Sequence, residues 1–186
     1  MDSRLLKIDA SIVTLRAAEV SDVPFIFELR RLERSNFMYP ISPEIRLQYD
    51  YFQKYIERYI AGEEIYFIIF DKIMGSYNGL LRLTRINETS GFGFESLIMK
   101  LASTPGAAID AIAAVYAIGF KYLGREICGP FLVPKENSRV IKLHHAMGVA
   151  RQIDEDQQFL HFSVTRDDYL SGEGRLTRMG FGNIDY

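Results

Sequence analysis

Proton transfer near neutral pH is a chemistry that three side chains of this sequence could perform. They are His144, His145 and His161, and histidine is the residue whose ordinary pKa lies closest to neutrality. These histidines have neither a cysteine partner nor the spacing of a metal-binding motif, so we predict no metal site. The single cysteine, Cys128, lies in an apolar run, and we interpret it as buried packing rather than as a nucleophile.

Two of these histidines lie in residues 137–149, the most informative segment of the chain. Its apolar side chains recur at the spacing of one helix face. They are Val140, Ile141, Leu143 and Met147. Asn137 is a candidate N-cap for this helix, and Gly148 is a candidate helix stop. Successive residues of a helix point about 100° apart, so His144 and His145 cannot serve the same site.

Residues 103–108 form a second segment with potential chemistry, a turn that leads into a long alanine-rich helix. The N-terminus of a helix presents unpaired N–H groups and a partial positive charge, which suit a phosphate group. Gly106 would let a ligand approach the backbone, and Ala107 and Ala108 keep that surface small. An ordinary helix start after a proline turn would have the same features, so both interpretations stay open.

Hydrophobic periodicity predicts the elements that must position these segments. The predicted strands cover residues 11–16, 64–71, 76–86, 92–101 and 126–133, with two more between 149 and 165. The predicted helices cover residues 23–32, 42–60 and 106–123, and a last helix runs from the Asn137 cap to Gly148. Such alternation predicts a mixed α/β fold with helices on the faces of the sheet. We expect one domain over residues 1–170 and a glycine-rich, polar tail without regular structure over 171–186.

Composition narrows the class of protein. The chain has 186 residues, of which 48% are hydrophobic and 25% are charged, as in an ordinary single globular domain. Its net charge of −2 provides no basic surface for a nucleic-acid partner. The sequence has no apolar run of membrane-spanning length and no long apolar stretch near its start, so we predict a cytoplasmic protein without a membrane partner.

The predicted order of elements is β, α, α, β, β, β, α, β, α, β, β. Together with the segment at 137–149, this order resembles the GNAT superfamily of acyl-CoA N-acyltransferases. In that family the last strand–helix unit carries an Asn, a Tyr seven residues later and then a Gly-Phe pair. Asn137 and Gly148 match this pattern, whereas His144 occupies the position of the Tyr.

Residues 103–108 resemble the pyrophosphate loop of the same family, which reads Gln or Arg, two residues, Gly, one residue, then Gly or Ala. Gly106 and Ala108 match, Ser103 replaces the Gln or Arg, and Pro105 stands where a basic residue is common. The resemblance implies acetyl-CoA as the co-substrate, with its pyrophosphate on the backbone of this loop. The backbone groups concerned are those of Thr104, Pro105, Gly106, Ala107 and Ala108.

The resemblance also implies the rest of the fold, a central twisted mixed sheet of about seven strands flanked by four helices. The strands at 92–101 and 126–133 are expected to splay apart and admit the pantetheine arm of CoA. Leu97, Ile98 and Met99 would line this arm on one side, and Asn137 would hydrogen-bond it from the other. Capping of a helix by Asn137 is compatible with that role.

Transfer of an acetyl group to an amine requires a neutral amine and a proton for the leaving thiolate. The resemblance implies Glu95 as the base, acting directly or through a water, and His144 as the proton donor in place of the usual Tyr. Each assignment has an alternative without a catalytic role. Glu95 would then lie on an exposed strand face, and His144 on the surface of its helix.

Residues 13–169 resemble two branches of the family, which acetylate the N-termini of ribosomal proteins and amino-sugar nucleotides. The loop at Phe37-Met38 and the tyrosine-rich helix after it are closer to the second branch. The tyrosines are Tyr39, Tyr49, Tyr51, Tyr55 and Tyr59, which would equally suit a core or a dimer surface. We therefore predict a small-molecule amine, an amino-sugar nucleotide, as the acceptor. A protein N-terminus, another small amine, a non-catalytic acyl-CoA-binding module and a homodimer stay open.

Overall fold

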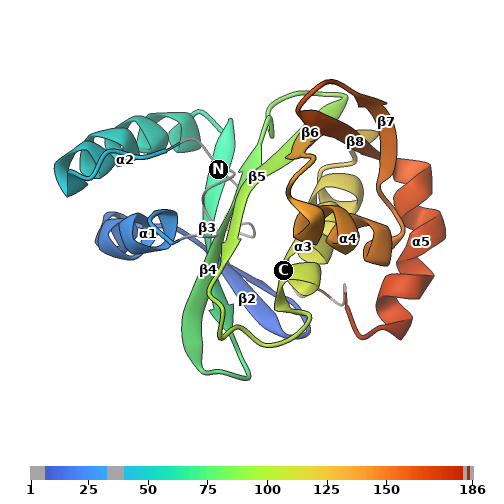
Figure 1. Cartoon of the computed structure of the whole chain (residues 1–186), viewed down its shortest axis with the longest axis horizontal. Helices are drawn as coiled ribbons and strands as arrows, with labels where there is room; N and C mark the ends of the chain where they lie inside the picture. Colours follow the sequence, from blue (N-terminus) through green and yellow to red (C-terminus); the bar gives the residue numbers. More distant parts are fainter. Residues whose placement is uncertain (1–6, 33–39, 182–183, 185–186) are drawn as a thin grey trace.

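A mixed sheet runs through the molecule and is the scaffold of the fold (Figure 1). The structure is a computed structural model, and it describes residues 7–32, 40–181 and 184. Within these residues the sheet has eight strands in the order β1-β2-β3-β4-β5-β6-β8-β7. The strands are β1 Lys7–Asp9, β2 Val13–Ala17, β3 Glu64–Asp71, β4 Ser76–Thr84, β5 Gly91–Met99, β6 Ile127–Pro134, β7 Arg151–Glu155 and β8 Phe159–Thr165. All neighbouring strands are antiparallel except β5 and β6, which are parallel.

The sheet confirms the mixed α/β fold, with one strand more than the sequence predicts. The additional strand is β1, which pairs antiparallel with β2 and places Ile8 opposite Leu15. Both side chains are fully buried. A strand of three residues is too short for hydrophobic alternation to be recognised in the sequence.

Helices cover both faces of the sheet (Figure 1). In the described residues, α1 (Val23–Arg30) and α2 (Ile45–Ile60) lie on one face, and α3 (Ala107–Ala117), α4 (Ser138–Met147) and α5 (Arg166–Arg178) lie on the other. A π-helical turn at Ile118–Tyr122 continues α3. No helix of these described ranges is long and apolar enough to cross a membrane.

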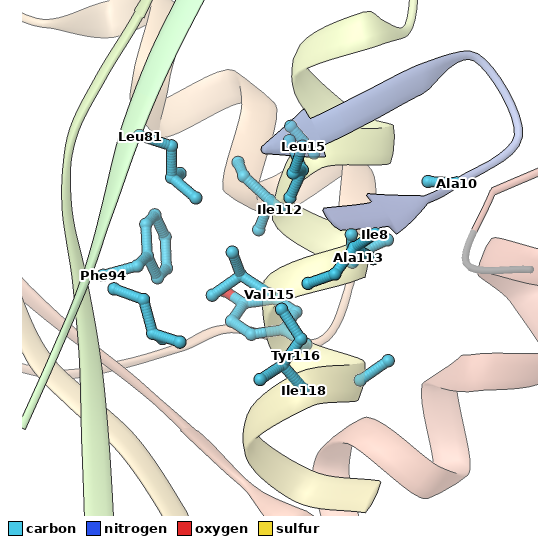
Figure 2. Packing of buried hydrophobic residues seen from close by; sticks show 14 of the residues in the cluster. Ile8, Ala10, Leu15, Leu81, Phe94, Ile112, Ala113, Val115, Tyr116 and Ile118 are labelled. Carbon is cyan, nitrogen blue, oxygen red and sulfur yellow. The ribbon is translucent and has the colours of Figure 1, made fainter. Parts of the chain in front are cut away.

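The larger hydrophobic core lies between the sheet and α3, where Phe94 of β5 and Tyr116 of α3 are packed (Figure 2). Residues 111–117 of α3 are almost completely buried, and because many of them are alanines the helix approaches the sheet closely. A Cβ at Gly119 would lie 2.1 Å from the ring of Phe92, so this glycine makes room for an aromatic ring of β5. A smaller core packs α1 and α2 on the opposite face, around Tyr55 and Ile68.

The segment after residue 170 corrects one prediction, because it does not begin as an irregular tail. Helix α5 runs through residues 166–178 and starts with a capping box between Thr165 and Asp168. Its Leu176 is buried in the larger core. The glycines at 172 and 174 disfavour a helix intrinsically, but a Cβ at Gly172 would lie 2.3 Å from Val149. Close packing of the helix therefore overrides the local propensity.

Candidate active site

Strands β5 and β6 are parallel neighbours that pair only where they begin. Their ladder consists of Gly91 opposite Ile127 and Phe92 opposite Cys128, and β5 then continues to Met99 without a further partner in β6, in a stretch that is fully described. Beyond the ladder, β5 stays paired with β4, and β6 stays paired with β8. The facing edges of the two strands therefore diverge from one point, which we call the fork. This is the splay that the resemblance to the GNAT superfamily implies.

A β-bulge just beyond the fork determines which way the side chains of β5 point. The register between β5 and β4 shifts near Glu95, and Ser96 has a φ of 58°, which non-glycine residues rarely adopt. After the bulge, Leu97 and Met99 pack toward α3, and Ile98 packs toward α1 and α2. The structure thus places all three residues predicted to receive the pantetheine arm on the part of β5 that β6 does not cover.

Glu95 lies on the α2 side of β5 and is half-exposed. Its carboxylate forms an ion pair with Arg82 of β4. Arg82 also donates a hydrogen bond of 2.7 Å to the hydroxyl of Tyr51 in α2 and lies 3.8 Å from the carboxylate of Glu64 in β3. Glu95 is therefore held by a charged network that joins three strands and a helix.

A polar pocket of about 340 Å³ opens beside this network. It is lined by Glu63, Glu64, Arg82, Thr84, Arg85, Asn87, Glu88 and Glu95. Four carboxylates face two guanidinium groups in this set, so the pocket carries an excess of negative charge. The side chain of Glu95 can therefore meet a polar molecule that enters from solvent.

His144 lies on the other side of β5 and is only 2% exposed. Its ring packs against Phe131 of β6 at 4.8 Å between centroids, against Phe162 of β8 at 5.5 Å and against Phe94 of β5 at 6.2 Å. The histidine thus contacts residues from both arms of the fork. The alternative of a surface histidine is wrong for His144, and it fits the exposed neighbour His145 instead.

The surroundings of His144 keep its ring neutral. Burial lowers its pKa to about 4, with a smaller contribution from the nearby His145. Its Nδ1 is buried and has no hydrogen-bond partner among the described residues. Near neutral pH the side chain is therefore a neutral imidazole. Any hydrogen bond that it donates comes from a neutral ring N–H and not from an imidazolium.

Glu95 and His144 are not brought into contact. They flank β5 from opposite faces, Glu95 toward α2 and His144 toward α4. Asn137 caps α4, since its Oδ1 accepts a hydrogen bond of 3.3 Å from the Val140 N–H, and Gly148 ends the helix with a φ of 70°. Both predicted ends of α4 are confirmed.

The loop before α3 is held in place by a buried carboxylate. Asp71, at the end of β3, accepts hydrogen bonds from the backbone N–H of Thr104 at 2.7 Å and from its hydroxyl at 2.8 Å. Burial by itself would raise the pKa of Asp71, but hydrogen bonds from Thr104 and Met74 outweigh it and lower the pKa. Asp71 is thus an anion that uses one of the N–H groups predicted to bind pyrophosphate.

The other donors of this loop divide into two sets. The N–H of Ala107 donates to the carbonyl of Thr104 at 3.0 Å, and Pro105 has no N–H group. The N–H groups of Gly106, Ala108 and Ile109 have no partner within the described part of the chain. These three remain available at the N-terminus of α3 for an anionic ligand.

Gly106 has a second role that the sequence does not reveal. Its φ is 90°, and a Cβ at this position would lie 2.8 Å from the ring of Phe181, which follows α5. Phe181 is 8% exposed and belongs to the larger core. A substitution at Gly106 would therefore disturb packing at the loop as well as any ligand bound there.

The acceptor side is only partly described. Phe37, Met38 and Tyr39 lie outside the described residues. Of the other tyrosines, Tyr55 is buried in the smaller core and its hydroxyl accepts a hydrogen bond of 3.1 Å from the Tyr66 N–H. Tyr49 and Tyr51 are 36% and 38% exposed on α2. The core interpretation therefore holds for Tyr55 and not for these two.

Three residues around the site are missing from the sequence-based prediction. Arg82 interrupts an apolar strand. A charged residue in such a strand indicates that a partner of opposite charge lies nearby in the fold. Asp71 ends an apolar strand beside a turn, but nothing in the sequence connects it to Thr104. Phe181 is a single aromatic residue in a polar, glycine-rich segment. No hydrophobic pattern around it indicates that it packs against Gly106.

Comparison with known proteins identifies the superfamily. No protein-family model matches the chain, and no curated protein sequence matches it. Among solved structures, FdhC, a nucleotide-linked sugar GNAT, is 30% identical, with a TM-score of 0.80 over 94% of this chain and 98% of that chain. A second solved structure is a chimera of the spermidine N-acetyltransferase SpeG from Vibrio cholerae and hSSAT. It is 21% identical, with a TM-score of 0.71 over 86% of this chain and 99% of that chain.

A candidate ribosomal-protein-serine acetyltransferase from Vibrio cholerae shares the fold at 14% identity, with a TM-score of 0.72 over 88% of this chain and 99% of that chain. The similarity to FdhC extends over nearly the whole of both proteins. The chain therefore belongs to the GNAT superfamily of acetyl-CoA-dependent N-acetyltransferases.

Proposed function

We propose that this protein transfers the acetyl group of acetyl-CoA to the primary amine of a nucleotide-linked amino sugar, by direct attack in a ternary complex. The observation that carries acetyl transfer is the fork, which has Glu95 on one face of β5 and His144 on the other. The sugar acceptor is supported by the similarity to FdhC, at 30% identity over 94% of this chain.

The residues of this chain fit acetyl-CoA. Its diphosphate would lie at the N-terminus of α3, where the N–H groups of Gly106, Ala108 and Ile109 are available and the helix dipole favours negative charge. The amide groups of its pantetheine arm would bind the edge of β5 at Leu97–Met99, with Asn137 on the opposite side. The co-substrate supplies the acetyl group already activated as a thioester.

Glu95 is proposed as the base, because an alkylammonium with a pKa near ~10 must lose a proton before it can attack. Its half-exposed position in the pocket lets it accept that proton directly or through a water. His144, as a neutral imidazole, would donate a ring N–H hydrogen bond to the leaving sulfur. The aromatic rings around it exclude water and strengthen that hydrogen bond.

A polyamine is a second candidate acceptor, and one observation favours it. The pocket beside Glu95 is lined by four carboxylates, which suit a molecule with several ammonium groups better than one with a diphosphate. The fold similarity to spermidine N-acetyltransferases, at 21% identity, is compatible with this alternative. The two candidates differ in the sign of charge that the acceptor brings to the pocket.

The test measures release of the CoA thiol at saturating acetyl-CoA with competing acceptors. These are a nucleotide-linked 4-amino-4,6-dideoxy sugar, spermidine and peptides with free N-termini, and CoA binding is followed in parallel by calorimetry. Preferential turnover of the sugar nucleotide is the expected result. Preference for spermidine or for peptides would contradict the sugar-nucleotide acceptor and identify the preferred amine instead. CoA binding without turnover of any amine would indicate a non-catalytic acyl-CoA-binding module.

A further inference from the structure

Arg85 lies directly after β4 and reaches the point where the fork begins. Its Nη2 donates hydrogen bonds to the carbonyl of Phe92 at 2.9 Å and to the carbonyl of Gly129 at 2.8 Å. Phe92 is the last residue of β5 that pairs with β6, and Gly129 is the residue of β6 directly after the ladder ends. One guanidinium group thus joins the two strands where their own hydrogen bonds stop.

The backbone around Arg85 leaves room for its side chain. A Cβ at Gly93 would lie 3.0 Å from Nη2 of Arg85 and 2.7 Å from the hydroxyl of Thr84. No positive φ is found at Gly93, so a side chain is excluded there by space and not by backbone conformation. Arg85 itself has a φ of 58°, which is uncommon outside glycine. The position of this guanidinium therefore depends on an uncommon backbone conformation at Arg85 and on the absence of a side chain at Gly93.

Two backbone carbonyls find their partner in this guanidinium. Buried backbone groups must find partners when a ladder ends, and here Arg85 provides the donor for both the Phe92 and the Gly129 carbonyl. The divergence of β5 and β6 therefore begins at a point where one side chain is bonded to both strands.

We infer that Arg85 is a positioning residue that fixes where β5 and β6 diverge and thereby sets the slot for the acyl-CoA arm. The inference rests on the proposed binding of acetyl-CoA between these strands. Phe92 and Gly129 each precede by two residues a ring that packs on His144, namely Phe94 and Phe131. Arg85 therefore acts on the slot and on the ring cage of His144 through two short stretches of backbone.

The test compares wild-type protein, Arg85→Ala and Gly93→Ala in calorimetric CoA binding and in steady-state kinetics. Loss of two hydrogen bonds from a charged donor is expected to weaken CoA binding about tenfold or more. The KM for acetyl-CoA should rise by a similar factor. Added methylguanidinium should restore CoA binding to Arg85→Ala but not to Gly93→Ala, where the new methyl group occupies the space.

Arg125→Ala is the matched control. Arg125 also donates to backbone carbonyls, those of Ile86 at 2.7 Å and Thr89 at 3.5 Å, but it bridges the β4–β5 loop and not the fork. It should leave CoA affinity unchanged. If Arg85→Ala does not fold, Arg85→Lys takes its place. The ammonium group of lysine keeps the charge and lacks the planar set of N–H donors of a guanidinium.

The outcomes separate this inference from the proposed function. Wild-type protein that does not bind CoA would overturn both. Wild-type binding together with unchanged CoA affinity in the folded Arg85 variants would overturn the role of Arg85 alone. An equal loss in Arg125→Ala, or the absence of methylguanidinium rescue in Arg85→Ala, would also overturn it.

Discussion

The two faces of β5 beyond the fork have opposite environments. On the α2 side, Glu95 is held by Arg82 in a charged pocket that opens to solvent. On the α4 side, His144 is buried among Phe94, Phe131 and Phe162. One face can exchange protons with water, and the other keeps a neutral ring in a dry cage.

The bulge at Glu95 and Ser96 allows a single strand to serve both faces. In a regular strand successive side chains alternate between the faces, whereas the bulge changes which residues point each way. β5 can therefore present a carboxylate to the pocket and still return Leu97 and Met99 to the core. The difference between the faces teaches that one strand can hold an ionisable carboxylate in a solvent-open pocket and a neutral imidazole in an apolar one.

The largest effect is expected from removing Glu95, the base proposed on the polar face. Glu95→Gln should lower turnover by ~10²–10⁴-fold with CoA affinity nearly unchanged, because the substitution removes a proton acceptor and keeps the side-chain shape. Steady-state kinetics and calorimetry measure the two quantities. The control is Glu63→Gln in the same pocket, which should keep the wild-type kcat and change at most the KM for the acceptor. Wild-type turnover in Glu95→Gln would remove Glu95 from the mechanism.

The buried face predicts a pH-dependent stability. Burial holds the pKa of His144 at about 4, below the ordinary value of about 6.5, so only the unfolded chain gains a proton between these values. The stability of the folded protein should therefore fall as the pH is lowered from about 6.5 toward about 4, by ~2 kcal/mol near pH 5. Urea unfolding at neutral and acidic pH measures this loss.

His144→Phe should abolish most of that pH dependence and also lower turnover, because it removes the N–H donor proposed for the leaving sulfur. His145→Gln is the matched control, since His145 is exposed on the same helix. It should retain the acid-dependent loss of stability. An unchanged pH profile in His144→Phe would show that the buried ring does not cause the loss.

The bulge that separates the faces should tolerate glycine better than a branched residue. Ser96→Val places a β-branched side chain at a φ of 58° and should cost ~1–2 kcal/mol of stability, with lower turnover because Glu95 is displaced. Ser96→Gly suits this φ and should stay closer to the wild type in both measurements. Equal stabilities of the two variants would mean that the bulge relaxes without cost.

The smallest effect is expected from loosening the network around Glu95. Tyr51→Phe removes the hydroxyl that accepts a hydrogen bond of 2.7 Å from Arg82. The free energy of unfolding should fall by ~0.5–1.5 kcal/mol or less. Turnover should fall only a few-fold, because Arg82 keeps its ion pair with Glu95. Tyr49→Phe on the same helix is the control. An equal effect of both substitutions would deny Tyr51 a role in positioning Arg82.

Much of the fold could be predicted because its signals are local. The bounds of β3 agree with the predicted strand, and Asn137 and Gly148 mark the ends of α4 as predicted. Hydrophobic periodicity and capping depend only on neighbours within a few residues, so the sequence carries them directly. The resemblance built on those local patterns also led to the splay of β5 and β6.

The sequence by itself determined the order of the elements from β2 to β8, the capped helix that carries His144 and the position of Glu95 on a central strand. Only the tertiary structure decided the state of these groups. His144 is neutral because rings from β5, β6 and β8 surround it, and Glu95 is held because Arg82 reaches it from β4. Such contacts join residues far apart in the chain, and burial and charge pairing set a side chain's chemistry through whichever groups the fold places beside it.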